Sequence, residues 1–131
     1  MRDAAKLMRL HALTETQFLA VQTEMSELSR QEQQLRENLA ALSKSVTSRA
    51  ALLEFSDDPA RIAGADIRWH RWVDQRKTTI NTQLANLLAR QEHCRARLQE
   101  AFGKTQVADK LLTRVKVKEE KIRKNRIGYE S

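Results

Sequence analysis

The feature that most constrains the fold of this chain is a repeat of mainly apolar residues in alternating steps of three and four residues. It runs without a break from Phe18 to Leu53. This spacing keeps one stripe of a helix facing a partner only when two helices wind around each other as a left-handed coiled coil. The repeat, which we call the first seam, consists of Phe18, Val21, Met25, Leu28, Glu32, Leu35, Leu39, Leu42, Val46, Arg49 and Leu53, and it extends back through Thr14, His11 and Leu7.

The chain supplies a partner for this helix in a second seam with the same steps. This second seam is preceded by Trp69, Val73 and Arg76. The spacing from these residues into the seam contains one extra residue, a stutter that locally unwinds the supercoil. The second seam consists of Ile80, Leu84, Leu87, Gln91, Cys94, Leu98, Ala101, Thr105, Ala108, Leu112, Val115, Glu119 and Ile122.

Between the two seams lies Phe55-Ser-Asp-Asp-Pro59. Ser and Asp compete for backbone donors and cap helices, and Pro is favoured at a first helical position. We therefore predict an all-α fold, a single antiparallel coiled-coil hairpin domain over residues 1–131. Its first helix covers about 3–54, its turn about 55–64 and its second helix about 65–126.

Two details of the hairpin follow from this folding point. Gly64 is either a hinge after a short helical turn from Pro59 to Ala63, or lies inside a straight helix at a cost of about 1 kcal/mol relative to Ala. Folding near Pro59 sets Leu53 beside Asp66, Met25 beside Cys94 and Leu7 beside Leu112, and everything after about Lys116 projects past the first helix. The last residues, 127–131, are expected to fray.

Composition agrees with a thin helical pair. Only 5% of the 131 residues are aromatic while 31% are charged, which suits a narrow seam better than a wide core. The formal net charge of +7 favours acidic partners. The single Cys94 forms no internal disulfide, and we find no signal peptide and no apolar run of the roughly 20 residues that a membrane span needs. We expect a soluble, cytoplasmic protein with no membrane insertion.

Catalytic and metal-binding patterns are missing from the sequence. His11, His70 and His93 lie far apart, and His93 and Cys94 are neighbours that point about 100° apart on a helix. There is no glycine-rich phosphate loop. We expect no enzymatic activity, no cofactor and no metal.

Polar side chains interrupt both seams, and we interpret them as register control, since a buried polar residue disfavours slipped pairings. The alternative is a binding site. The set is His11, Thr14, Glu32, Arg49, Gln91, Thr105 and Glu119.

Both tryptophans, Trp69 and Trp72, lie beside the expected turn. Only one of them can sit squarely on the seam. Either both cover the end of the hairpin by packing on Phe55 and Ile62, or an exposed Trp anchors a partner, because Trp and Arg are enriched in binding hot spots. The surrounding arginines are Arg68, Arg71 and Arg76.

The end of the second helix is densely basic and predicts an electrostatic docking site for phosphates or for an acidic protein surface. No aromatic residue interrupts the run before Tyr129, which weakens the case for stacking on single-stranded nucleic acid. The cations are Lys110, Arg114, Lys116, Lys118, Lys121, Arg123, Lys124 and Arg126.

This layout resembles the FliJ-type flagellar export proteins and their YscO-type injectisome counterparts. The local likeness lies in Ile67-Arg-Trp-His-Arg-Trp-Val-Asp-Gln75 and Cys94-Arg-Ala-Arg-Leu-Gln-Glu-Ala101. The resemblance implies a stalk of a type III secretion system whose paired helix ends enter the pore of a hexameric export ATPase. Its other end would meet the cytoplasmic domain of the export-gate membrane protein, so that it works at the inner membrane, and some members also handle export chaperones.

Carried onto this chain, the resemblance gives the ATPase-facing end to Arg2, Lys6 and Arg9 together with the basic residues from Lys110 to Arg126. It gives the gate-facing end to Trp69, Trp72 and Arg76. The family often carries more acidic residues at its C-terminus than the single Glu130 found here. Two alternatives remain open: a general coiled-coil adaptor or chaperone, and a nucleic-acid-binding protein that uses the basic helix end.

Overall fold

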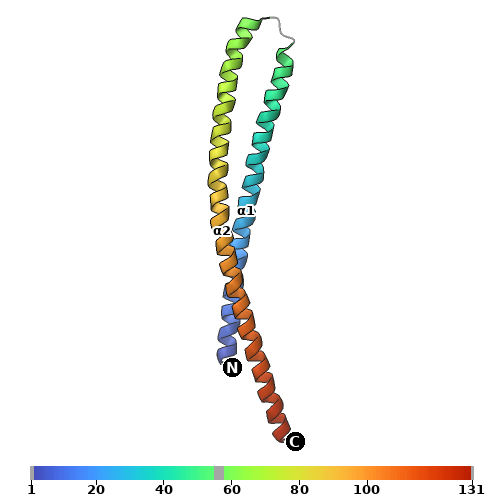
Figure 1. Cartoon of the computed structure of the whole chain (residues 1–131). Helices are drawn as coiled ribbons and strands as arrows, with labels where there is room; N and C mark the ends of the chain where they lie inside the picture. Colours follow the sequence, from blue (N-terminus) through green and yellow to red (C-terminus); the bar gives the residue numbers. More distant parts are fainter. Residues whose placement is uncertain (1, 55–57, 131) are drawn as a thin grey trace. The chain divides into compact units, whose positions relative to one another are not determined.

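The computed structural model describes residues 2–54 and 58–130, the side chains of Arg61 and Glu130 excepted. It contains two α-helices in these residues, α1 (Arg2–Leu53) and α2 (Pro59–Glu130), and no strand. The helices run side by side in opposite directions (Figure 1). The predicted fold, an all-α antiparallel hairpin, is thus confirmed.

Contacts divide the chain into two compact units, and each helix contributes to both. Unit 1 comprises Met1–Ser26 and His93–Ser131, and unit 2 comprises Glu27–Glu92. In unit 1 the Phe18 and Phe102 rings pack with centroids 5.6 Å apart. In unit 2 Arg49 Nε lies 3.5 Å from Asp66 Oδ1.

The first seam is confirmed along its whole length, because each of its positions from Leu7 to Leu53 is buried or half-buried. In the second seam every position from Ile80 to Val115 is likewise covered, and Ile80 and Cys94 are only 1% exposed. One detail differs at the stutter. Arg76 is exposed and Lys77 is half-buried in its place, so the extra residue falls between Trp69 and Lys77.

The helix pairing follows the expected register to within about one turn. Cys94 Sγ lies 3.7 Å from the carbonyl oxygen of Val21, one turn before Met25. Asp66 meets Arg49 where Leu53 was expected, again a shift of one turn. Sequence spacing fixes which faces meet but leaves a shift of about one turn along the helices open.

Helix α2 begins at Pro59 and not near Ala65, and it runs straight through Gly64. The carbonyl oxygen of Asp58 accepts the first helical hydrogen bond, from Ile62 N at 3.2 Å. A methyl group at Gly64 would meet nothing within 4 Å, so no close approach requires glycine there. The continuous hydrogen bonds of the helix outweigh a glycine cost of about 1 kcal/mol. The helix also continues to Glu130, beyond the expected end near Arg126. The expected turn residue Phe55 lies outside the described residues.

Two polar seam residues face each other in unit 2. The buried Gln91 donates hydrogen bonds from Nε2 to Glu32 Oε1 at 2.9 Å and to the carbonyl oxygen of Leu28 at 3.3 Å. The hydrogen bond from Gln91, followed by the one from Arg36, lowers the pKa of Glu32 from its ordinary value of 4.5. A slipped pairing would bury the amide without these acceptors, which is the physical basis for register control.

Replacing Gln91 with Leu is therefore expected to raise the pKa of Glu32 toward 4.5, with Arg36 still lowering it in part. A carboxyl group whose pKa is lowered on folding stabilises the folded state at pH values above its ordinary pKa. This contribution is lost as the pH falls through the folded-state pKa. The free energy of unfolding of the Gln91→Leu protein should thus fall less between neutral and acidic pH than that of the parent. NMR titration of the Glu32 carboxyl carbon measures the shift. Gln33→Leu, which removes an exposed amide bonded to Glu37, is the control and should leave Glu32 unchanged.

Candidate functional site

The C-terminal part of α2 forms a basic overhang, which we define as residues 116–129. Every side chain in it is exposed, and Figure 1 shows that this end of α2 continues past the N-terminus of α1 within unit 1. At 1.5 Å per residue the overhang is about 21 Å long. The expected projection beyond about Lys116 is thus confirmed.

Charge in the overhang is strongly unbalanced. Six Lys and Arg residues stand against Glu119 and Glu120. Lys124 Nζ lies 3.7 Å from Glu120 Oε1, an exposed pair of the kind that contributes little stability. Lys118, Lys121 and Lys124 continue the stripe of Lys110 and Arg114 in steps of four, four, three and three, while Lys116, Arg123 and Arg126 lie on different faces. The positive charge therefore surrounds the helix.

The N-terminal cations lie near the beginning of this overhang. His11 Nε2 is 3.7 Å from Asp109 Oδ1, which sets Arg9 and Lys110 at about the same level of unit 1. Arg2, Lys6 and Arg9 are all exposed. By the same register Lys6 lies at about the level of Arg114 and Arg2 at about the level of Lys118, whereas the cations from Lys121 onward extend beyond them.

The two tryptophans of unit 2 have different surroundings. Trp69 is half-buried under the guanidinium of Arg49, whose Cζ lies 4.5 Å from the ring centroid, and its ring also meets the His70 ring at 70°, with centroids 5.2 Å apart. Asp66 completes this cluster with an ion pair to Arg49 at 3.5 Å, without hydrogen-bond geometry, and its Oδ2 lies 3.4 Å from His70 Nε2. The expectation that only one Trp sits on the seam is confirmed.

Trp72 is the tryptophan that is free to meet a partner. It is 54% exposed, and steps of four residues place it on one face of α2 with Arg68 and Arg76, both of them exposed. Of the three gate-facing candidates, Trp72 and Arg76 therefore form a surface, while Trp69 is largely occupied by its own chain.

Unit 2 also carries a groove that sequence reasoning missed. It consists of two open hollows along the boundary of the helices, of about 420 and 250 Å³. They adjoin, because Gln34 Nε2 from the first donates a hydrogen bond to Asn38 Oδ1 of the second at 3.2 Å. We call this the amide groove after its amide side chains, which are Gln31, Gln34, Asn38, Gln83 and Asn86.

A signal for this groove was present in the sequence. Arg76, Gln83 and Arg90 recur every seven residues on α2, and Gln31, Asn38 and Ser45 recur in the same way on α1. Such positions flank the seam of a coiled coil on one side. Because these positions are not part of either seam, the seam pattern does not single them out.

Neither a metal cluster nor a membrane span is found in the described part of the chain. No three His, Cys, Asp or Glu side chains converge there as a metal site would require. None of its helices combines the length and apolar character needed to cross a bilayer.

Comparisons with protein-family models, curated proteins and solved structures found no match to this chain.

Proposed function

We propose that this protein is a non-enzymatic stalk of a type III protein export apparatus, flagellar or injectisome. In this proposal the basic end of unit 1 enters the ring of a hexameric export ATPase. The Trp72 and Arg76 surface of unit 2 contacts the cytoplasmic domain of the export gate. The protein then works in the cytoplasm at the inner-membrane export apparatus, and export chaperones are further partners.

The observation that carries this proposal is the basic overhang, a single exposed helix about 21 Å long with cations on several faces. A rod in the pore of a ring meets walls on all sides. Exposed charge pairs contribute about 0–1 kcal/mol each, so many of them together can hold a rod without locking it in one orientation. The resemblance of the sequence to FliJ-type proteins supplies the identity of the ring.

The basic overhang also favours a second candidate function, nucleic-acid binding through phosphate contacts. Tyr129, 93% exposed, is the one aromatic side chain of the overhang that could stack on a base. Because there is only one stacking residue, at the very end of the helix, nucleic-acid binding is less well supported than insertion into a protein ring.

The test uses the full-length chain with the purified export ATPase of the same host. We expect the chain to bind the ATPase and to raise its rate of ATP hydrolysis at physiological salt. Salt dependence alone cannot distinguish an acidic pore from nucleic acid, so duplex DNA is added as a competitor. Stimulation that persists in excess DNA supports the stalk. Binding to DNA with no effect on the ATPase would refute it.

A further inference from the structure

The amide groove has an arginine near each end. Arg76 lines one hollow and Arg90 the other, with Gln83 midway between them at heptad spacing. The flanking positions of α1 that line the same hollows are Ser45, Asn38 and Gln31, and none of these is acidic. In the described part of the chain, no carboxylate lies within ion-pair distance of Arg76 or Arg90.

The next arginine of the same heptad series does have a carboxylate partner. Arg97, seven residues after Arg90, meets Glu24 of α1 in unit 1, with Nη1 2.9 Å from Oε2. Seven residues separate Glu24 from Gln31 in the same way. This side of α2 is therefore neutralised where α1 offers a glutamate and stays positive where α1 offers an amide or a hydroxyl.

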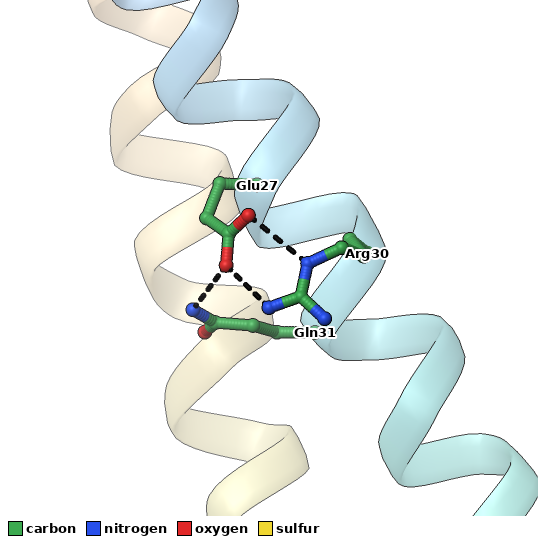
Figure 2. A network of polar contacts seen from close by, with 3 residues as sticks. All are labelled: Glu27, Arg30 and Gln31. Atoms are coloured by element: carbon green, nitrogen blue, oxygen red, sulfur yellow. Dashed lines mark hydrogen bonds and ion pairs between the residues drawn. The ribbon is translucent and has the colours of Figure 1, made fainter.

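Glu27, which accepts hydrogen bonds from two residues that line the groove, is already engaged. Figure 2 shows Arg30 and Gln31 both directed at its carboxylate. Arg30 donates from Nη2 to Oε1 at 2.6 Å and from Nε to Oε2 at 3.0 Å, and Gln31 donates to Oε1 at 3.3 Å. The hydrogen bond from Arg30, then that from Gln31, lowers the pKa of Glu27 to about 2. Glu27 thus compensates the charge of Arg30 and leaves that of Arg90 unmatched.

We propose that the amide groove docks an acidic helix of a partner protein, with two carboxylates, two heptads apart, that meet Arg76 and Arg90. Fourteen residues of helix span about 21 Å, so one helix laid along the groove reaches both arginines. The amides between them both donate and accept hydrogen bonds and so suit polar side chains on that helix. Trp72, one turn from Arg76, covers the end of the bound helix. Trp72 and Arg76 are also the side chains assigned above to the export gate, but this proposal does not rest on the stalk function.

Other occupants fit the groove less well. A second copy of the chain would bring its own arginines, and like charges repel. A nucleic acid presents phosphates at every nucleotide, whereas the groove offers two unmatched cations about 21 Å apart with neutral amides between them.

The test uses the full-length chain and a synthetic helical peptide whose Glu residues are fourteen positions apart with Gln midway. A control peptide of the same composition has both Glu residues moved to its opposite face. Binding is measured by fluorescence anisotropy at physiological salt. We expect the Arg76→Gln/Arg90→Gln protein to bind the first peptide about tenfold more weakly than the parent. Arg71→Gln, which removes one positive charge from another face, should bind as the parent does.

Equal affinity for the two peptides would overturn the proposal, as would an equal loss in the Arg71→Gln protein. Self-association that disappears in the double variant, measured by sedimentation, would assign the groove to a second copy instead. DNA binding that weakens in the same variant would assign it to nucleic acid. Because both arginines are exposed, all variants should retain the helical circular dichroism of the parent.

Discussion

Replacing Lys118, Lys121 and Lys124 together with Glu is expected to abolish binding to the export ATPase ring and leave the hairpin intact. Each replacement changes the charge by two, so the formal net charge falls from +7 to +1. Three contacts worth up to about 1 kcal/mol each are lost, and an acidic wall would repel the new glutamates. Together these effects weaken binding by about a hundredfold or more. Co-sedimentation with the ATPase and its rate of ATP hydrolysis measure the effect.

The fold should tolerate these changes because all three side chains are exposed beyond the paired part of unit 1. Among the described residues, the substitutions break the ion pair of Lys124 with Glu120, an exposed pair within the helix worth only about 0.2–0.5 kcal/mol. Circular dichroism and thermal unfolding should therefore match the parent.

A control variant separates the position of the charge from its total. Lys44→Glu, Arg71→Glu and Lys104→Glu together also lower the formal net charge to +1, and all three side chains are exposed. We expect this protein to bind the ATPase nearly as well as the parent. If both triple variants lose binding equally, the overhang is not a specific docking segment, and the assignment of this end of the molecule to the ring is wrong.

Replacing Ile80 with Ala is expected to lower the free energy of unfolding by about 2–4 kcal/mol, which is large for a hairpin with so thin a core. Ile80 is 1% exposed, and its side chain is among the largest of the fully buried ones. Deleting its outer atoms removes buried apolar surface and leaves space that two rigid helices cannot close completely. Urea unfolding followed by circular dichroism measures the loss.

Ile67→Ala is the matched control, because Ile67 lies on the same helix of unit 2 and is 59% exposed. Its replacement should change the free energy of unfolding by no more than about 0.5 kcal/mol. Similar losses in the two variants would mean that the seam through Ile80 does not stabilise the pair, against the burial pattern on which the fold assignment depends.

The sequence by itself determined the seam. Alternating steps of three and four residues allow only one stripe of each helix to be covered, so the buried positions from Leu7 to Leu53 and from Ile80 to Val115 could be predicted one by one. The sequence also determined the overhang, because the second seam continues beyond the last position that can pair with the first seam. The exposure of every side chain from Lys116 to Tyr129 follows from that difference in length.

Only the tertiary structure decided what happens beside the seam. Local propensity left Gly64 open, and the structure carries α2 straight through it. Spacing alone could not say that Arg49 covers Trp69 and leaves Trp72 exposed, because that depends on which side chains of the other helix lie at the same level. The amide groove arises in the same way. Heptad spacing shows that Arg76 and Arg90 share a face. Whether they have carboxylate partners depends on which residues of α1 lie opposite them, and this is decided by the pairing of the two helices.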